Sequence, residues 1–464
     1  MTIADRPNLL FLMTDHQRAD SLGMVQSGAE VTPNLNRLAG AGTRFTRAYT
    51  TCPLCVPART ALATGKYPTK NGVVFNDWQG VRAGDHMPLH QMLFEAGYSV
   101  GHIGVDHIRV APSLRERISF ASWYNSHDYV TYVSNLATVR ASDDVSSFRR
   151  PVTENQGGRR LPVKYSNTLT AVWPFPAEHF LDAYYGRQAC EFISQPHPQP
   201  FALFLYLWAP HPPLRVPEPY ASRFNPDSLD LPANVGHRTA EEPPGRRNGI
   251  AAQLAEGVSQ EAWRRVWAAH LGLVNMADEI IGEVLASVDQ AGLSDDTVIC
   301  FTADHGDHLG QHVMYQKMEM YEPAINIPLI MKGPGIHAQV VDGVVSHLDI
   351  LPTLTNYLHL KALPDIDGIS QAETLTNGTP PAEERMIFAQ YSGNPTVGDI
   401  RRAIVTQRHK AIFDPVDQPE LFDLEHDPLE MHNLAGNADC QDQLEELKRA
   451  CQSWAQAHND WVTL

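Results

Sequence analysis

One cysteine lies where the sequence predicts the start of a helix. Pro57 comes just before the Ala-Leu-Ala segment of residues 61–63, and proline is typical of the first turn of a helix. Cys55 would then lie at the helix N-terminus, where backbone N–H groups and the helix dipole favour an anion and would lower the pKa of a thiol. Arg59 follows one helical turn later, and its guanidinium could bind a tetrahedral oxyanion. The spacing predicts a nucleophile and an anion-binding arginine on one helix.

Two simpler interpretations of this segment remain open on the residues alone. Cys55 could be a structural cysteine, or Cys52 and Cys55 could form a Cys-x-x-Cys redox pair. The redox interpretation lacks the thioredoxin-like context in which such pairs usually occur.

Two acid–imidazole pairs each follow an apolar run. Asp15 and His16 follow residues 8–13, and Asp304 and His305 follow residues 297–301. If the two runs end at the same edge of a sheet, these pairs could hold a divalent cation beside the nucleophile. Each residue taken alone is more often a cap or a core hydrogen-bonding group, so the prediction depends on their joint occurrence.

The elements that would position these residues are buried strands. Continuous apolar runs of this length suit strands covered on both faces, as in a parallel sheet. The runs cover residues 8–13, 98–103, 201–208 and 297–301. Helical patterns lie between them, most clearly over about 262–291, with Gly292 as the stop signal. We predict an α/β fold with a large doubly wound, mostly parallel sheet flanked by helices, whose ligands collect at the carboxyl ends of the strands.

The sequence also indicates two domains. A large α/β domain is predicted over residues 1–365, with an insertion at about 111–176 that would cover the site, form an oligomer contact or be a plain surface loop. A smaller α+β domain is predicted over 366–464. It would contain strands at 386–391 and 400–413, the latter with a turn near Arg408-His409, and a final helix at 439–461.

A longer pattern then suggests a family. Cys55-x-Pro57-x-Arg59 followed by Thr64-Gly65-x-Tyr67-Pro68 resembles the signature of type I sulfatases, in the alkaline phosphatase superfamily. Further matches follow in the family's order, at residues 7–15, 32–35, 301–306, 349–353 and 420–424. The resemblance implies that a separate maturation enzyme oxidises Cys55 to formylglycine. The hydrated aldehyde would attack sulfur or phosphorus, and the resulting hemiacetal would then expel sulfate.

The resemblance also implies a metal site. Its ligands would be Asp15, Asp304, His305 and the formylglycine oxygen at position 55. Position 16 is usually Asp in arylsulfatases and Gln in the phosphonate monoester hydrolase branch, so His16 departs from both. Imidazole is a poor ligand for Ca²⁺ and a good one for Mn²⁺ or Zn²⁺. We therefore expect one divalent metal, Ca²⁺ or Mn²⁺, with His16 as a further candidate ligand.

Two basic residues resemble the family's substrate-binding groups. His211 follows the run at 201–208 and resembles the histidine that contacts the ester or its leaving group. Lys317 resembles the lysine that binds the sulfate oxygens and assists the leaving oxygen. Relief of charge on that oxygen is what ester cleavage of this kind needs most.

The sequence departs from arylsulfatases at one position. Val105 stands where they carry a lysine that holds nucleophile and sulfate, while His107 remains in register. The phosphonate monoester hydrolase branch also lacks this lysine and carries a substrate-binding asparagine, whose place Asn76 fits. With one cation fewer, the pocket suits a monoanion: a sulfate monoester, a phosphate diester or a phosphonate monoester.

Charge, hydropathy and cysteine content limit the partners and the location that we expect. The net charge is −17, which disfavours nucleic acid as a partner. No apolar stretch approaches the roughly 20 residues of a membrane helix, and the first residues do not form a signal peptide, so we expect a cytoplasmic enzyme without a membrane partner. Six cysteines in 464 residues imply no disulfide framework.

The leading hypothesis is a sulfatase for small-molecule sulfate esters that also cleaves phosphodiesters and phosphonate monoesters. The alternatives are a phosphonate monoester hydrolase or phosphodiesterase as the native role, and a non-catalytic binding module. Homo-oligomerisation remains an open possibility.

Overall fold

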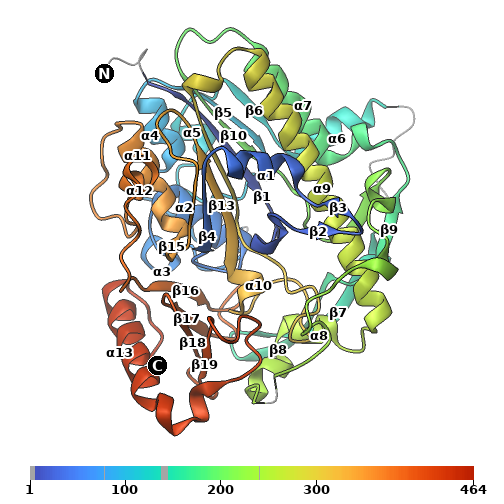
Figure 1. Ribbon diagram of the computed structural model, residues 1–464, viewed down its shortest axis with the longest axis vertical. Helices are drawn as coiled ribbons and strands as arrows, with labels where there is room; N and C mark the ends of the chain where they lie inside the picture. The colour runs from blue at the N-terminus through green and yellow to red at the C-terminus, as the bar shows by residue number, and fades with distance from the viewer. Residues whose placement is uncertain (1–5, 78, 137–144, 240) are drawn as a thin grey trace.

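The computed structural model describes residues 6–77, 79–136, 145–239 and 241–464. Its centre is a nine-stranded sheet (Figure 1). In spatial order the strands are β14 (Gln339–Val341), β4 (Thr43–Tyr49), β13 (Asn326–Lys332), β12 (Thr297–Ala303), β1 (Asn8–Thr14), β10 (Phe201–Tyr206), β5 (Ser99–Gly104) and β6 (Ser122–Tyr124), and β15 (Val345–Ser346) pairs with β4 beside β14. Within this sheet β13 alone runs against its neighbours, so the predicted mostly parallel sheet is confirmed.

The central strands are apolar and fully buried. In the register of β1 with its two neighbours, Phe11 lies between Phe204 and Cys300. Alternate residues of β1 face opposite ways: Leu10 and Leu12 belong to one hydrophobic cluster, and the residues before and after each belong to another. This explains why these runs show no polar alternation in the sequence.

Helices cover both faces of the sheet. The face of Leu10 is covered by α1 (Pro33–Gly40), α7 (Leu181–Ser194) and the long α9 (Gln260–Gln290). The opposite face is covered by α2 (Cys55–Thr64), α4 (Leu89–Glu95) and α11 (Ile350–Tyr357). The predicted helix at 262–291 corresponds to α9. Gly292, just after the helix, has a left-handed backbone conformation (φ 70°).

Several further elements are short. They are β2 (Val25–Gln26), β3 (Ala29–Glu30), α3 (Pro68–Asn71), α8 (Ile250–Ala255), α10 (Glu322–Ile325) and α12 (Ala372–Asn377).

The segment at 111–176 is built into the fold. It contains α5 (Leu114–Arg117), the sheet strand β6, α6 (Ser126–Ser134), the hairpin β7 (Arg149–Gln156) and β8 (Arg159–Ser166), and β9 (Thr170–Trp173), which pairs with β11 (Leu214–Pro217). The hairpin contacts the chain's own C-terminal part, where Gly157 N–H donates to the carbonyl of Val397. The described part is therefore not a plain surface loop; residues 137–144 lie outside the described residues.

The C-terminal part forms the smaller α+β unit that the sequence predicts. An antiparallel sheet of β16 (Ile387–Tyr391), β17 (Arg401–Val405), β18 (His409–Phe413) and β19 (Glu420–Asp423) packs against α13 (Gln441–Ala457). The final helix is shorter than predicted at both ends, since Asn437 caps a 3₁₀ turn before it and His458 ends it. Among the described residues, no helix is both long and apolar enough to cross a bilayer.

Candidate active site at the carboxyl edge of the sheet

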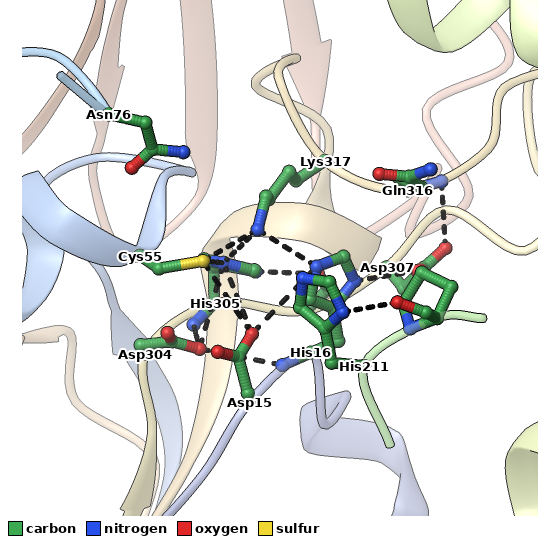
Figure 2. A network of polar contacts seen from close by, with 12 residues as sticks. Asp15, His16, Cys55, Asn76, His211, Asp304, His305, Asp307, Gln316 and Lys317 are labelled. Carbon is green, nitrogen blue, oxygen red and sulfur yellow. Dashed lines mark hydrogen bonds and ion pairs between the residues drawn. The ribbon is translucent and has the colours of Figure 1, made fainter. Parts of the chain in front are cut away.

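Helix α2 begins at Cys55, as the sequence predicts. Its N-cap residue Leu54 is extended, and Gly65 ends the helix in a left-handed conformation (φ 67°), where a side chain would be strained. Every residue of α2 is buried, and Cys55 is 4% exposed. The helix N-terminus therefore lies inside the protein and faces the ends of β1 and β12 (Figure 2).

Arg59 binds carboxylates of its own chain. Its Nε lies 2.8 Å from Asp304 Oδ2, and an Nη lies 2.8 Å from Asp15 Oδ2, with all three side chains fully buried. The structure thus gives Nε and one Nη to the two aspartates, while Nη1 has no hydrogen-bond partner among the described residues, and a contact of Arg59 with a substrate oxyanion stays a prediction. Each aspartate uses Oδ2 for Arg59. Asp15 Oδ1 then faces Cys55 Sγ at 3.7 Å, whereas Asp304 Oδ1 accepts the backbone N–H groups of His305 and His16.

Lys317 reaches the centre of the cluster. Its Nζ lies 2.7 Å from Cys55 Sγ, 2.9 Å from His16 Nε2 and 3.1 Å from His305 Nε2. The flanking residues Gln316 and Met318 have φ of 66° and 80°, a conformation that non-glycine residues rarely adopt. Such backbone strain persists where the surroundings enforce it, often at functional sites.

His16 also has a left-handed backbone (φ 66°) and is fully buried. Its Nδ1 lies 2.8 Å from Asp307 Oδ2, and its Nε2 lies 3.8 Å from Asp15 Oδ1. Asp307 was not among the residues predicted for the site. Its position two residues after the predicted ligand His305 is the one signal in the sequence, and that signal does not indicate which side chain Asp307 contacts.

The predicted lowering of the Cys55 thiol pKa is wrong. Burial, with a smaller contribution from the nearby Asp15 carboxylate, raises the pKa of Cys55 to about 12. Burial likewise raises the pKa of Asp15 to about 7, with a contribution from Asp304. Burial lowers the pKa of Lys317, but Cys55, Asp15 and Asp304 outweigh it, so the pKa lies above its usual value. A buried, protonated thiol is a poor nucleophile as it stands.

Asn76 lies at the start of α2, and both ends of its side chain are engaged. Its Oδ1 accepts from Val56 N–H at 3.1 Å, and its Nδ2 donates to Asn394 Oδ1 at 2.9 Å. Asn394, from the loop between β16 and β17, also donates to the Tyr165 hydroxyl on β8 at 2.6 Å. The C-terminal unit and the hairpin thus meet at the helix that carries Cys55, a junction for which the sequence gave no signal.

The other predicted residues lie around this cluster. The His211 ring is 4.5 Å from the His16 ring and 4.0 Å from the Trp208 ring, between centroids. The His107 ring lies 6.1 Å from Trp208, and its pKa falls well below the usual value because of burial and the charge of Arg59. Val105 is buried in the hydrophobic cluster that includes α2.

The donor set fits a divalent cation. One potential ligand atom from each of Asp15, Cys55, Asp304 and His305 lies within 4.8 Å of all the others. A second group, Asp15, His16 and His211, meets the same limit. Because Arg59 binds Oδ2 of each aspartate, an ion would be held by Asp15 Oδ1 and by Asp304 Oδ1, which also accepts two backbone N–H groups.

Comparisons with known proteins agree with this geometry. The family model described as "Sulfatase" matches residues 7–360, and one described as "N-sulphoglucosamine sulphohydrolase, C-terminal" matches residues 310–457. An arylsulfatase of Clostridium perfringens is 25% identical, covering 96% of this chain and 93% of the relative. A multifunctional alkaline phosphatase superfamily protein of Trinickia caryophylli is 26% identical, covering 98% and 96%.

A solved structure has the same fold. The phosphonate monoester hydrolase of Silicibacter pomeroyi superimposes with a TM-score of 0.79 at 24% identity, covering 98% of this chain and 96% of that one. Because one family model spans most of the sequence and the site has the geometry described above, the chain belongs to the sulfatase family of sulfate ester hydrolases, within the alkaline phosphatase superfamily.

Proposed function

We propose that this enzyme hydrolyses sulfate monoesters of small molecules, with a formylglycine derived from Cys55 as its nucleophile. The observation that carries the proposal is the set of contacts at position 55. Lys317 Nζ lies 2.7 Å and His305 Nε2 lies 3.3 Å from Sγ, beside two carboxylates that Arg59 orients. Conversion of the residue to an aldehyde would remove the handicap of the protonated thiol, because a hydrated aldehyde supplies a hydroxyl nucleophile.

Asp15, Asp304, His305 and position 55 would hold the metal ion, with His16 as a further candidate. A bound divalent cation supplies charge stabilisation to the ester oxygens and activates a coordinated hydroxyl. Arg59 would be a positioning residue, since its Nε and Nη2 fix both aspartates.

Lys317 and His211 would act on the ester itself. The raised pKa of Lys317 keeps its ammonium charged, so it can bind the sulfate oxygens and offset negative charge on the leaving oxygen. His211 Nδ1 is bonded to the carbonyl of Pro212, which turns Nε2 toward His16 and the site. His107 would be a further catalytic residue, on the side of the site where Trp208 lies. Asn76 would bind the substrate and would also hold the N-terminus of α2 through its hydrogen bond with Val56 N–H.

The charge of the pocket favours a monoanionic substrate. Arg59 is committed to two carboxylates and Val105 supplies no charge, which leaves Lys317 as the ammonium beside Cys55. A sulfate monoester, a phosphate diester and a phosphonate monoester all carry one negative charge. We therefore propose side activity on the two phosphorus esters. Native phosphonate monoester hydrolysis is the second candidate, favoured by Val105 and Asn76.

Two measurements test the proposal together. In protein co-expressed with a formylglycine-generating enzyme, the peptide containing residue 55 should be about 18 Da lighter than encoded, because the conversion removes sulfur and two hydrogens and adds one oxygen. The kcat/KM should be higher for an aryl sulfate than for an aryl phosphonate monoester, and Cys55→Ala should abolish both activities.

An intact thiol in such protein would contradict the formylglycine assignment. A higher kcat/KM on the phosphonate would make the second candidate the native role. The maturation enzyme as a partner, a homo-oligomer and a cytoplasmic location stay predictions.

A further inference from the structure

The tautomer of His16 follows from its two partners. Asp307 Oδ1 accepts the backbone N–H groups of Leu309 and Gln316, each at 3.0 Å, which fixes this carboxylate in place. Its other oxygen, Oδ2, lies 2.8 Å from His16 Nδ1. A carboxylate can only accept, so Nδ1 carries the proton and Nε2 carries a lone pair.

The contacts of Lys317 also indicate which nitrogen of His16 carries the proton. An ammonium has three donors and no acceptor, and Lys317 Nζ meets Cys55 Sγ, His16 Nε2 and His305 Nε2. Both imidazoles must therefore present a lone pair at Nε2. For His305 this agrees with its Nδ1, which lies 3.0 Å from the carbonyl of Gly306.

Both lone pairs lie close to the same carboxylate oxygen. His16 Nε2 and His305 Nε2 are each 3.8 Å from Asp15 Oδ1, and Asp304 Oδ1 is 3.7 Å from His305 Nε2. An ion that displaces the Lys317 ammonium from the two Nε2 atoms would meet two imidazole nitrogens and two carboxylate oxygens, all from fully buried residues. Hydrogen bonds from ligating histidines to carboxylates or carbonyls fix the ring and raise its basicity as a ligand.

We propose that His16, held by Asp307, is a metal ligand that makes this site select a borderline transition-metal ion, Mn²⁺ or Zn²⁺, over Ca²⁺. This inference rests on the proposed metal-assisted function and specifies the cation class. Ca²⁺ takes six to eight oxygen ligands, whereas imidazole nitrogens suit transition metals. Asp307 is a positioning residue that acts through His16.

Metal uptake in the absence of substrate tests this directly. The full-length protein is stripped with a chelator, incubated with equal concentrations of Ca²⁺, Mn²⁺ and Zn²⁺, desalted and analysed for metal content. The wild type should retain about one transition-metal ion per chain and little Ca²⁺, and the Mn²⁺ and Zn²⁺ contents show which of the two it prefers. His16→Asp should shift retention toward Ca²⁺, because it exchanges a nitrogen for oxygens.

The sharper variant is Asp307→Asn. Its Oδ1 can still accept the two backbone N–H groups, but its NH₂ would donate to His16 Nδ1 and force the proton onto Nε2, where it blocks the lone pair. We expect Mn²⁺ or Zn²⁺ to bind roughly 10–100-fold more weakly, with Ca²⁺ affinity changed less. Asp182→Asn is the matched control, because Oδ1 of this fully buried carboxylate accepts two backbone N–H groups, those of Trp208 and Ala209, and its Oδ2 has no hydrogen-bond partner in the described part of the chain.

Three results would overturn the inference: preferential Ca²⁺ retention by the wild type, unchanged transition-metal affinity in folded Asp307→Asn, or two ions per chain. The last would assign His16 to a separate site with Asp15 and His211. Circular dichroism of each variant checks that it is folded. Because no substrate is present, transition-metal retention without sulfatase activity would count against the proposed function alone.

Discussion

Two buried arginine–carboxylate clusters in this protein use the same groups differently. In the active site, Arg59 joins Asp15 and Asp304 through one oxygen of each. The second cluster joins the catalytic part to the C-terminal sheet, and its ion pairs are among fully or almost fully buried side chains: Arg246, Glu319, Arg401, Asp414 and Glu420.

The two clusters differ in whether both oxygens of each carboxylate already have partners. Glu420 Oε2 accepts from Arg246 and its Oε1 accepts from the Tyr321 hydroxyl. Asp414 Oδ2 accepts from Arg246 and Arg401, and its Oδ1 accepts from Val416 N–H. Asp15 Oδ1 instead faces Cys55, His16 and His305. A cluster that satisfies its own atoms stabilises structure, whereas one that leaves oxygens directed at a nucleophile can bind an ion.

Breaking the second cluster should have the largest effect, and that effect should be on stability. Arg246→Met leaves Glu420 buried without its guanidinium, while Asp414 and Glu319 keep only Arg401, so the free energy of unfolding should fall by about 3–5 kcal/mol. Urea unfolding followed by circular dichroism measures it. Arg247→Met is the control, since Arg247 is 57% exposed and should cost little. A loss of kcat with unchanged stability would contradict the assignment.

Breaking the first cluster should mainly change activity. Arg59→Lys keeps the charge but replaces a fork that reaches two carboxylates with one ammonium, so Asp15 and Asp304 lose their fixed spacing. The kcat/KM for an aryl sulfate should fall about 100-fold. Arg402→Lys provides the comparison, because Arg402 is a fully buried arginine whose fork binds Asp460 and neither of the two site aspartates. Equal losses of activity in the two variants would erase the distinction.

The third prediction concerns Asp182, a buried carboxylate without an arginine partner among the described residues. Its substitution should have the smallest of the three effects. Asp182 is fully buried, accepts the N–H groups of Trp208 and Ala209, and has its pKa raised to about 6 by burial. The folded state therefore holds its proton longer than the unfolded state, so stability should decrease as pH rises from about 4 to about 6, by on the order of 2 kcal/mol. Asp182→Asn should remove this decrease in urea titrations at several pH values. The same slope in the variant would assign it to another group.

The fold, and which residues lie together at the candidate site, could largely be predicted from the sequence. Strands β1 and β12 are buried on both faces, so each is a continuous apolar run that can be recognised without knowing which strands lie beside it. Pro57 and Gly65 mark the two ends of α2. These local signals place Asp15, Cys55 and Asp304 at one edge of the sheet.

The contacts among site residues could not be predicted in the same way. Asp307 meets His16 across 291 positions and Asn394 meets Asn76 across 318, and nothing local specifies either contact. The direction of the Arg59 fork and the raised thiol pKa depend on burial and on the positions of charges in space. A helix N-terminus alone favours a thiolate, but complete burial and a neighbouring carboxylate outweigh it.

The burial of Cys55 also bears on when the protein can mature. The thiol lies beneath Lys317 on a helix with no exposed residue, and Arg59 ties that helix to the ends of two strands. A separate enzyme could engage this segment only while it is extended. We therefore expect the proposed conversion to compete in time with folding during synthesis, and chains that fold first to remain permanently in the thiol form.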